Sequence, residues 1–337
     1  MSALDIPVPF SSLDAAPVLR PTPPMKTLLF ATTLALTPAA AFGQDASQCT
    51  VELIVLGVAQ DGGAPQMGNA ADRAWTDPSL RRLAVSLGVV DRQSGQRLMF
   101  EATPDMREQL YRLDQAMPVE ARPGLDGVFL THAHIGHYTG LMFLGHESMG
   151  AHAVPVYAMP RMAEYLTGNG PWSQLVRYEN IALQPMADGE AVVLDRVTVT
   201  PFVVPHRQEF SEVVGYRIEG PERSALFIPD IDSWEEWEAL GTRIEDMIAG
   251  VDIAYLDATF YANGEIPGRD MSGFPHPFVA HSMERFASLP ASERAKVHFI
   301  HFNHTNAVRY PDAPERGVVE AAGYGLADEG ERFCLGG

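Results

Sequence analysis

Three histidines lie within six positions of this chain, His132, His134 and His137, and they closely follow the apolar run Gly127–Leu130. The run predicts a buried strand that ends in a loop. Alternate residues of an extended segment point the same way, so we expect His132 and His134 to reach one metal ion. Gly136 frees the backbone, which allows His137 to turn back from the helix that follows. Because neutral imidazole is the commonest metal ligand in proteins, the spacing predicts a metal site.

The order His-x-His-x-Gly-His resembles the His-x-His-x-Asp-His motif of the metallo-β-lactamase superfamily, with Gly136 at the position of the aspartate. Five further segments are similar to those of pyrroloquinoline quinone biosynthesis protein B, namely residues 55–66, 101–107, 256–260, 300–306 and 314–316. Protein B itself carries acidic residues at the positions of His132 and His134, and a cysteine cluster after its first loop that this chain lacks. The resemblance therefore indicates a protein-B-like member, and it covers nearly everything from residue 50 onward.

The fold class that follows is α/β (α+β), an αββα four-layer sandwich formed by a single domain over residues 50–337. Runs rich in Val and Leu, separated by turn residues, predict strands; they lie at 51–56, 82–90, 97–100, 154–158, 213–218, 224–228, 251–256 and 296–302, the last of these being the final core strand. A hairpin that turns at Asp195 is expected over residues 191–204. Helices are expected at 140–149, 161–166, 234–240 and 279–289.

In the superfamily, the remaining metal ligands lie at the ends of strands. His206 follows an apolar run and resembles the third histidine of the first metal site. Asp230 ends another such run and resembles the aspartate that bridges two ions, with Asp232 as its competitor. His301 and His304 compete for the last ligand position, and the resemblance favours His301 because it lies at the end of an expected strand.

The same resemblance implies an acid–base pair. Related RNA-processing members use a histidine before the last strand together with an acidic residue of an Asp/Glu-Ala-Thr-Phe segment, whose acidic residue here is Asp257. A carboxylate that orients an imidazole sustains its positive charge and suits proton transfer. His276 and His281 both lie in the appropriate part of the chain, and the sequence leaves the choice between them open.

Gly136 bears on the number of bound ions. In the full motif the aspartate, His137 and the final histidine hold the second ion, and the bridging aspartate is shared. Loss of one carboxylate predicts a single tightly bound ion, with two as the alternative. Gly136→Asp is then expected to raise the occupancy, unless the glycine is needed for its backbone conformation. Asp61 in the first loop could supply a substitute carboxylate, and Tyr138 and Asp105 are weaker candidates.

The expected function is hydrolysis of a small molecule. A zinc-like ion lowers the pKa of its bound water to about 7, and such water attacks an ester, lactone, amide or phosphodiester. The alternatives are an iron-dependent oxidative enzyme linked to pyrroloquinoline quinone biosynthesis and a metal-binding accessory protein without turnover. Zinc is the expected cofactor, with iron or manganese as alternatives. The net charge of −19 disfavours a nucleic acid substrate, because an acidic surface repels phosphate backbones.

Residues 25–43 predict a signal peptide. Met25 and Lys26 give it a short basic start, an apolar run follows, and the small residues at 39–43 suit cleavage. The apolar run is shorter than the about 20 residues that a membrane span needs. We interpret residues 1–24, which are rich in proline, as an extension upstream of the true start. The expected mature protein is therefore periplasmic or secreted and has no membrane span.

The two cysteines, Cys49 and Cys334, lie just before the first expected strand and near the C-terminus. Export exposes a protein to an oxidising compartment, where disulfides form and persist. We therefore expect a bond between Cys49 and Cys334, with two free thiols as the alternative.

Overall fold

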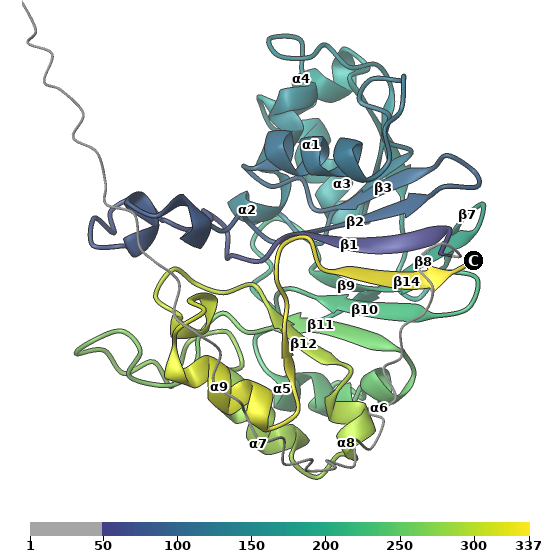
Figure 1. The fold of residues 1–337 in the computed structure, drawn as a ribbon. Coiled ribbons are helices and arrows are strands. Elements are labelled where there is room, and N and C mark those ends of the chain that lie inside the picture. The colour runs from purple at the N-terminus through teal and green to yellow at the C-terminus, as the bar shows by residue number, and fades with distance from the viewer. Residues whose placement is uncertain (1–48) are drawn as a thin grey trace, which may run out of the picture. The chain divides into compact units, whose positions relative to one another are not determined.

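The computed structural model describes residues 49–337. The segments interpreted as an upstream extension (1–24) and a signal peptide (25–43) lie outside the described residues. The strands of residues 49–337 form two sheets that pack face to face, and helices cover the outer side of each (Figure 1). This arrangement confirms the αββα four-layer sandwich.

The first sheet has the strand order β14-β1-β2-β3-β4-β5-β6. Its strands are β1 (Val51–Gly57), β2 (Ser86–Asp91), β3 (Arg97–Phe100), β4 (Gly127–Phe129), β5 (Val154–Ala158), β6 (Ile181–Pro185) and β14 (Arg332–Gly336). Pairing is antiparallel from β14 to β3 and parallel from β3 to β6. The histidine motif begins at the carboxyl end of β4, so it lies at one edge of this sheet.

The second sheet has the strand order β13-β12-β11-β10-β9-β8-β7. Its strands are β7 (Val192–Leu194), β8 (Val197–Val203), β9 (Val214–Glu219), β10 (Ser224–Ile228), β11 (Ile253–Asp257), β12 (Val297–Ile300) and β13 (Gly325–Leu326). The pairs β7–β8 and β9–β10 are antiparallel hairpins, whereas β10, β11 and β12 are parallel. These three parallel strands therefore end side by side.

Helices cover the two outer faces (Figure 1). The first sheet carries α1 (Met106–Ala116), α3 (Pro160–Gly168) and α4 (Trp172–Arg177). The second carries α5 (Trp234–Ala239), α6 (Ile244–Ala249), α7 (Val279–Phe286), α8 (Ala291–Arg294) and α9 (Pro314–Ala321). The short α2 (Ile135–Tyr138) follows β4, and 3-10 turns occur at η1 (Arg73–Trp75), η2 (Pro78–Leu80), η3 (Thr139–Leu144) and η4 (Ala307–Arg309).

Aromatic rings join the two sheets directly behind the end of β4. Phe100 and Phe129, at the ends of β3 and β4, stack with their ring centroids 5.1 Å apart. Tyr216 of β9 meets both rings edge-on, and its hydroxyl donates to the carbonyl of Leu130. All three side chains are buried, and aromatic pairs of this kind add about 0.5–1.5 kcal/mol each to simple burial. The backbone that leads into the histidine motif is thus fixed by the core.

Several expected elements differ from those observed. The helix predicted over 140–149 is wrong: the 3-10 turn η3 ends at Leu144, because Gly145 has an extended backbone (φ −69°, ψ 172°). The strand predicted over 82–90 begins only at Ser86, since the residues before it form isolated bridges to the first loop. The strand predicted over 296–302 is not the last, because β13 and β14 follow it.

The predicted disulfide between Cys49 and Cys334 is confirmed, and the two Cα atoms lie 5.8 Å apart. The bond links Cys49, which lies shortly before β1, to β14, which is the neighbour of β1 in the sheet. Within residues 49–337, no helix has both the length and the apolar character that crossing a membrane requires.

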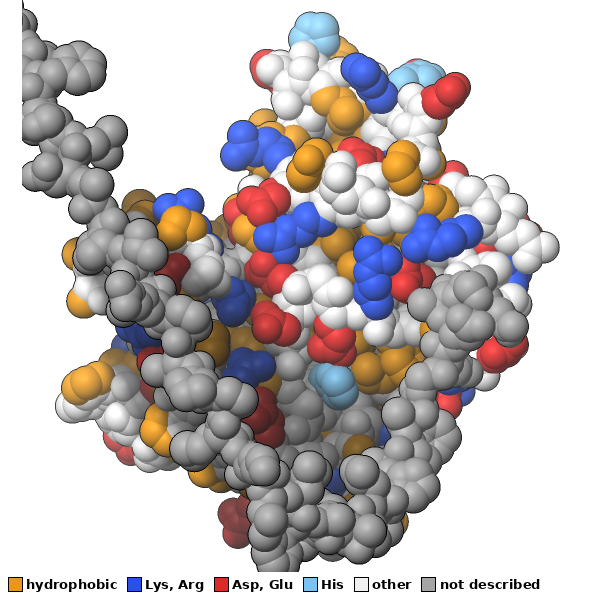
Figure 2. Space-filling model, in the orientation of Figure 1, with side chains coloured by type: hydrophobic (Ala, Val, Ile, Leu, Met, Phe, Trp, Pro, Cys, Tyr) orange, Lys and Arg blue, Asp and Glu red, His pale blue; other side chains and the backbone are white. Residues whose placement is uncertain are grey.

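Charged side chains of both signs are interspersed on the face shown in Figure 2, with no patch of a single sign. Ion pairs form among such residues. Arg73, for example, lies 2.9 Å from Asp312, and both side chains are exposed. Exposed pairs contribute about 0–1 kcal/mol each, so their main effect is on the character of the surface.

Candidate metal centre

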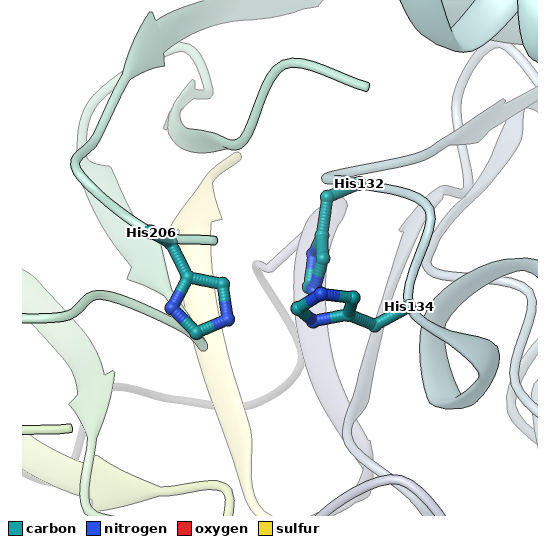
Figure 3. Close-up of side chains that lie close together, drawn as sticks. All are labelled: His132, His134 and His206. Carbon is teal, nitrogen blue, oxygen red and sulfur yellow. The ribbon is translucent and has the colours of Figure 1, made fainter. Parts of the chain in front are cut away.

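The first group of donors consists of His132, His134 and His206, which converge from the loop after β4 and the loop after β8 (Figure 3). One ligand atom of each residue lies within 4.8 Å of those of the other two. Three imidazoles around one point leave a fourth position of a tetrahedral ion open, as in catalytic zinc sites.

Hydrogen bonds fix the orientation of these rings. Nδ1 of His132 lies 2.8 Å from the hydroxyl of Thr131, which donates to Glu101 at 2.5 Å. Nδ1 of His206 lies 2.6 Å from Asp232. A metal-binding histidine commonly engages its other nitrogen in this way, so Nε2 of His132 and of His206 is left for an ion. His134 has the opposite arrangement: its Nε2 lies 3.3 Å from Glu209, which leaves Nδ1. Asp232, the competitor for the bridging position, therefore lies behind His206 rather than between the donor groups.

The second group consists of Asp61, His137 and His301, which come from the loop after β1, from α2 and from the end of β12. Nδ1 of His137 lies 3.1 Å from Glu101, and Nδ1 of His301 lies 2.9 Å from the hydroxyl of Thr259. Oδ1 of Asp61 lies 3.3 Å from Nε2 of His137. The two histidines of this group repeat the arrangement of His132 and His206, with Nδ1 held by the protein and Nε2 turned toward other donors.

Asp230, which follows β10, lies between the two groups. Its Oδ1 is 3.7 Å from Nε2 of His206, whereas its Oδ2 is 3.0 Å from Nε2 of His137 and 3.4 Å from Nε2 of His301. The side chain is buried. A carboxylate in this position can offer one oxygen to each of two neighbouring ions.

Four of these donor atoms fit a metal ion because they are buried without a hydrogen-bond partner among the described residues. They are Nε2 of His132, His137 and His301, and Oδ2 of Asp230. Leaving a buried polar atom unsatisfied costs about 1–3 kcal/mol, and a bound cation would satisfy all four. The mixture of imidazole and carboxylate suits zinc, iron or manganese.

The pKa values of the donor histidines are shifted in opposite directions. Burial, reinforced by the neighbouring His137, holds the pKa of His132 well below its usual range, so that ring is neutral. Burial opposes a charge on His137, but Glu101 and Asp230 outweigh it and hold its pKa well above the usual range. Burial likewise opposes ionisation of Asp230, but His301 and His137 hold its pKa well below the usual range. A positive charge is therefore favoured on His137, beside the ionised Asp230, and disfavoured on His132.

Asp257 and His276 form a pair beside this centre. Nδ1 of His276 lies 2.8 Å from Oδ2 of Asp257 and 3.7 Å from Oδ1 of Asp230. Burial opposes a charge on His276, but Asp257 outweighs it and raises the pKa of His276 to about 8. His281, by contrast, lies on α7, is 45% exposed and is 3.3 Å from Glu235. Of the two candidate histidines, only His276 lies beside Asp257.

Three further candidates lie apart from the donor groups. His304 is in none of the groups found among residues 49–337; its Nδ1 lies 2.9 Å from the amide nitrogen of Asn69. The hydroxyl of Tyr138 lies 2.8 Å from that of another tyrosine. Asp105 accepts the backbone N–H of Ala84 at 2.8 Å. The structure therefore places His301, and not His304, with the other donors.

Residues 96–334 match the family model described as the beta-lactamase superfamily domain, and the donor groups lie at one edge of the matching sandwich. The chain belongs to the metallo-β-lactamase superfamily. It is also 26% identical over 315 residues to the coenzyme PQQ synthesis protein B of Xanthomonas axonopodis pv. citri, which covers 85% of this chain and 100% of the relative. This similarity confirms the resemblance to protein B noted in the sequence.

Solved structures of superfamily proteins have the same fold. Zinc-bound PqqB from Methylobacterium extorquens superposes with a TM-score of 0.69 at 24% identity, covering 84% of this chain and 99% of that one. A diphosphatase of the PhnP family superposes with a TM-score of 0.58 at 23% identity, covering 84% of this chain and 96% of that one.

Sequence reasoning missed the residues that orient the superfamily's histidines. Glu101 contacts both Thr131 and His137, and it has the unusual backbone φ of +75°. Thr259 likewise orients His301, because its hydroxyl lies 2.9 Å from Nδ1 of that ring. Glu101 and Thr259 both lie in segments that resemble protein B. The resemblance identified these segments, but it did not show that the two residues orient metal-binding histidines. The signal in the sequence that could have found them is a polar residue close to the end of a buried strand.

Proposed function

We propose that this protein is a metal-dependent hydrolase that acts on a small-molecule ester, lactone, amide or phosphodiester. The observation that carries the proposal is the convergence of His132, His134 and His206, with Nδ1 of His132 and His206 held by the protein. Such a site binds zinc with one position open. The superfamily also contains a diphosphatase with this fold, which supports hydrolysis as the reaction class.

The metal ligands, Asp230 and His276 have separate roles in the proposed hydrolysis. His132, His134 and His206 would hold a zinc-class ion, which would supply a nucleophile at neutral pH by lowering the pKa of a water molecule to about 7. Asp230 is ionised and buried next to His206, so its carboxylate can orient the attacking group. His276 carries a proton at neutral pH, because its pKa is raised to about 8, and Asp257 holds its ring in place. His276 is thus suited to protonate the leaving group.

A second candidate function is an oxidative reaction at iron, and a third is metal binding without turnover. The similarity to PQQ synthesis protein B over its full length favours these alternatives. The metal in the purified protein separates them. Zinc with hydrolysis supports the first proposal, and iron with oxygen-dependent turnover supports the second.

We also propose that the protein works in the periplasm or outside the cell. The Cys49–Cys334 disulfide supports this location, because such bonds persist in oxidising compartments.

The test is to change one ligand of the first group. His134→Ala removes a neutral nitrogen donor from a loop, and we expect the ion of the first group and the hydrolysis of nitrophenyl esters and phosphodiesters to be lost together. Elemental analysis and initial rates give the two measurements. His152→Ala, at an exposed histidine outside the donor groups, is the control that should change neither. A His134→Ala protein with the metal content of the parent would contradict the proposal.

A further inference from the structure

The glycine at the motif's aspartate position is the one departure from the superfamily's metal motif. Gly136 lies in α2, and its φ is outside the left-handed region. The glycine is therefore not required for an unusual backbone conformation. Glycine is instead required because there is no room for a side chain at position 136.

The space beside Gly136 is filled by Asp61. A Cβ placed on Gly136 would overlap both Cα and Oδ1 of Asp61 and would come within 2.9 Å of its Cβ. Real Cβ atoms do not approach other heavy atoms this closely. The backbone and the carboxylate of Asp61 thus lie in the space that a side chain at position 136 would occupy.

The loop that carries Asp61 is anchored to the strand end that carries His301. The N–H of Gln60 donates to the carbonyl of Phe302 at 2.9 Å, and the N–H of Phe302 donates to Val58 at 2.8 Å. The side-chain amide of Asn303 donates to that of Gln60. These bonds fix Asp61, which follows Gln60, next to His301, which precedes Phe302.

Asp61 faces the donors of the second group. Its Oδ1 lies 3.3 Å from Nε2 of His137, and ligand atoms of Asp61, His137 and His301 all lie within 4.8 Å of one another. Oδ2 of Asp230 approaches the same two imidazole nitrogens at 3.0 and 3.4 Å. Nε2 of His137, Nε2 of His301 and Oδ2 of Asp230 are buried without a hydrogen-bond partner among the described residues.

We propose that Asp61 replaces the missing motif aspartate, so that Asp61, His137, His301 and Asp230 hold a second metal ion beside the first. The inference rests on the proposed metal centre and adds a ligand from a different segment of the chain. Two carboxylates and two imidazoles form a donor set that zinc, manganese and iron accept. Asp230 is then shared, as in two-metal sites whose ions lie about 3.5–4 Å apart.

The proposal reverses the expectation for Gly136→Asp. The motif alone predicts that this change adds a ligand and raises the metal occupancy. Because Asp61 fills the space, we expect Gly136→Asp to displace the loop and to lower the occupancy. Gly136→Ala, which adds no donor atom, should displace the same loop and lower the occupancy in the same way.

The experiment is a titration of zinc into the demetallated full-length protein. Calorimetry measures the affinity of each ion, and elemental analysis measures the number of ions bound. We expect about two ions per parent chain and about one in Asp61→Asn, whose second ion should bind at least about 100-fold more weakly. Asp312→Asn, at an exposed carboxylate that pairs with Arg73, is the matched control and should keep two ions. The ion that Asp61→Asn retains also shows that this variant is folded.

Each other outcome contradicts a specific part of the argument. Two equally tight ions in Asp61→Asn, a single ion in the parent, or a raised occupancy in Gly136→Asp would overturn the role of Asp61 while leaving a hydrolase with one ion possible. A parent chain that binds no metal would overturn the proposed hydrolase as well. If Asp61→Asn does not fold, Gly136→Ala tests the same point with every donor atom present.

Discussion

At the scale of single residues, Glu101 connects the two donor groups. Its carboxylate accepts the hydroxyl of Thr131, which orients His132, and it also lies 3.1 Å from Nδ1 of His137. Glu101 has a φ of +75°, and His301 a φ of +70°, although neither is glycine. Such backbone strain costs about 1–3 kcal/mol per residue and tends to cluster at functional sites. The strain here lies at one metal donor and at the residue that orients two others.

The proposed proton donor gives a prediction at the same scale. His276→Gln removes a titratable ring while Thr259 still holds Asp257. We expect kcat for a substrate of the parent to fall by about 10²–10⁴-fold, with the metal content unchanged. The matched control is His281→Gln, because His281 is exposed and pairs with Glu235 outside the centre. Loss of metal from His276→Gln would instead make His276 a ligand, and an unchanged kcat would exclude it as the proton donor.

At the scale of helices and strands, the donors lie at strand ends that meet at one edge. His206, Asp230 and Asp257 follow or end β8, β10 and β11, and His301 follows β12. Each strand is placed by the core, and each polar residue follows where the apolar run stops. These four residues are therefore positioned by rigid elements, which favours a preformed geometry, whereas Asp61 lies in the long connection between β1 and β2.

This pattern explains which features could be predicted from the sequence. The hairpins β7–β8 and β9–β10 were predicted because alternating side chains and turn residues are local signals. His206 and Asp230 were found because each follows an apolar run. The strand β14 was not predicted, because its partner β1 lies at the other end of the domain. The sequence offers Asp61 only as one of three candidates for the same reason: its contacts with Gly136 and His301 depend on the folded chain.

Helix α5 gives a prediction at the scale of an element. The hydroxyl of Ser233 accepts the backbone N–H groups of Glu235 and Glu236 and so caps the start of the helix. We expect Ser233→Ala to lower the free energy of unfolding by about 1 kcal/mol. Urea unfolding of demetallated protein with the disulfide intact measures it. Ser148→Ala, at an exposed serine, is the control, and an equal loss in both variants would show that the cap contributes nothing.

At the scale of the whole domain, the disulfide joins the beginning and the end of the first sheet. Cys49 precedes β1, and Cys334 lies within β14, opposite Glu52 in the register of the two strands. The sequence separation of the cysteines is 285 residues. In the chain-entropy model, closing a loop of this length removes about 5–6 kcal/mol of chain entropy from the unfolded state. The bond therefore acts on the stability of the sandwich as a unit and not on the metal centre.

Cys334→Ser tests this contribution in protein folded under oxidising conditions. We expect the free energy of unfolding to fall by about 2–5 kcal/mol, with the metal content of the parent retained. Thiol titration of the denatured parent, without reductant, should find no free thiol. The variant Cys49→Ser with Cys334→Ser should match the single change. Equal stability of parent and variant would show that the bond does not constrain the unfolded chain.

The bond between Cys49 and Cys334 also makes the polypeptide between them a closed ring. Cleavage of any one peptide bond inside the ring opens it without producing two molecules, because sulfur still joins the pieces. The donor segments, from Asp61 to His301, all lie inside the ring. A protein nicked once in a surface loop therefore keeps every metal donor in one covalent body until a reductant reaches the sulfurs.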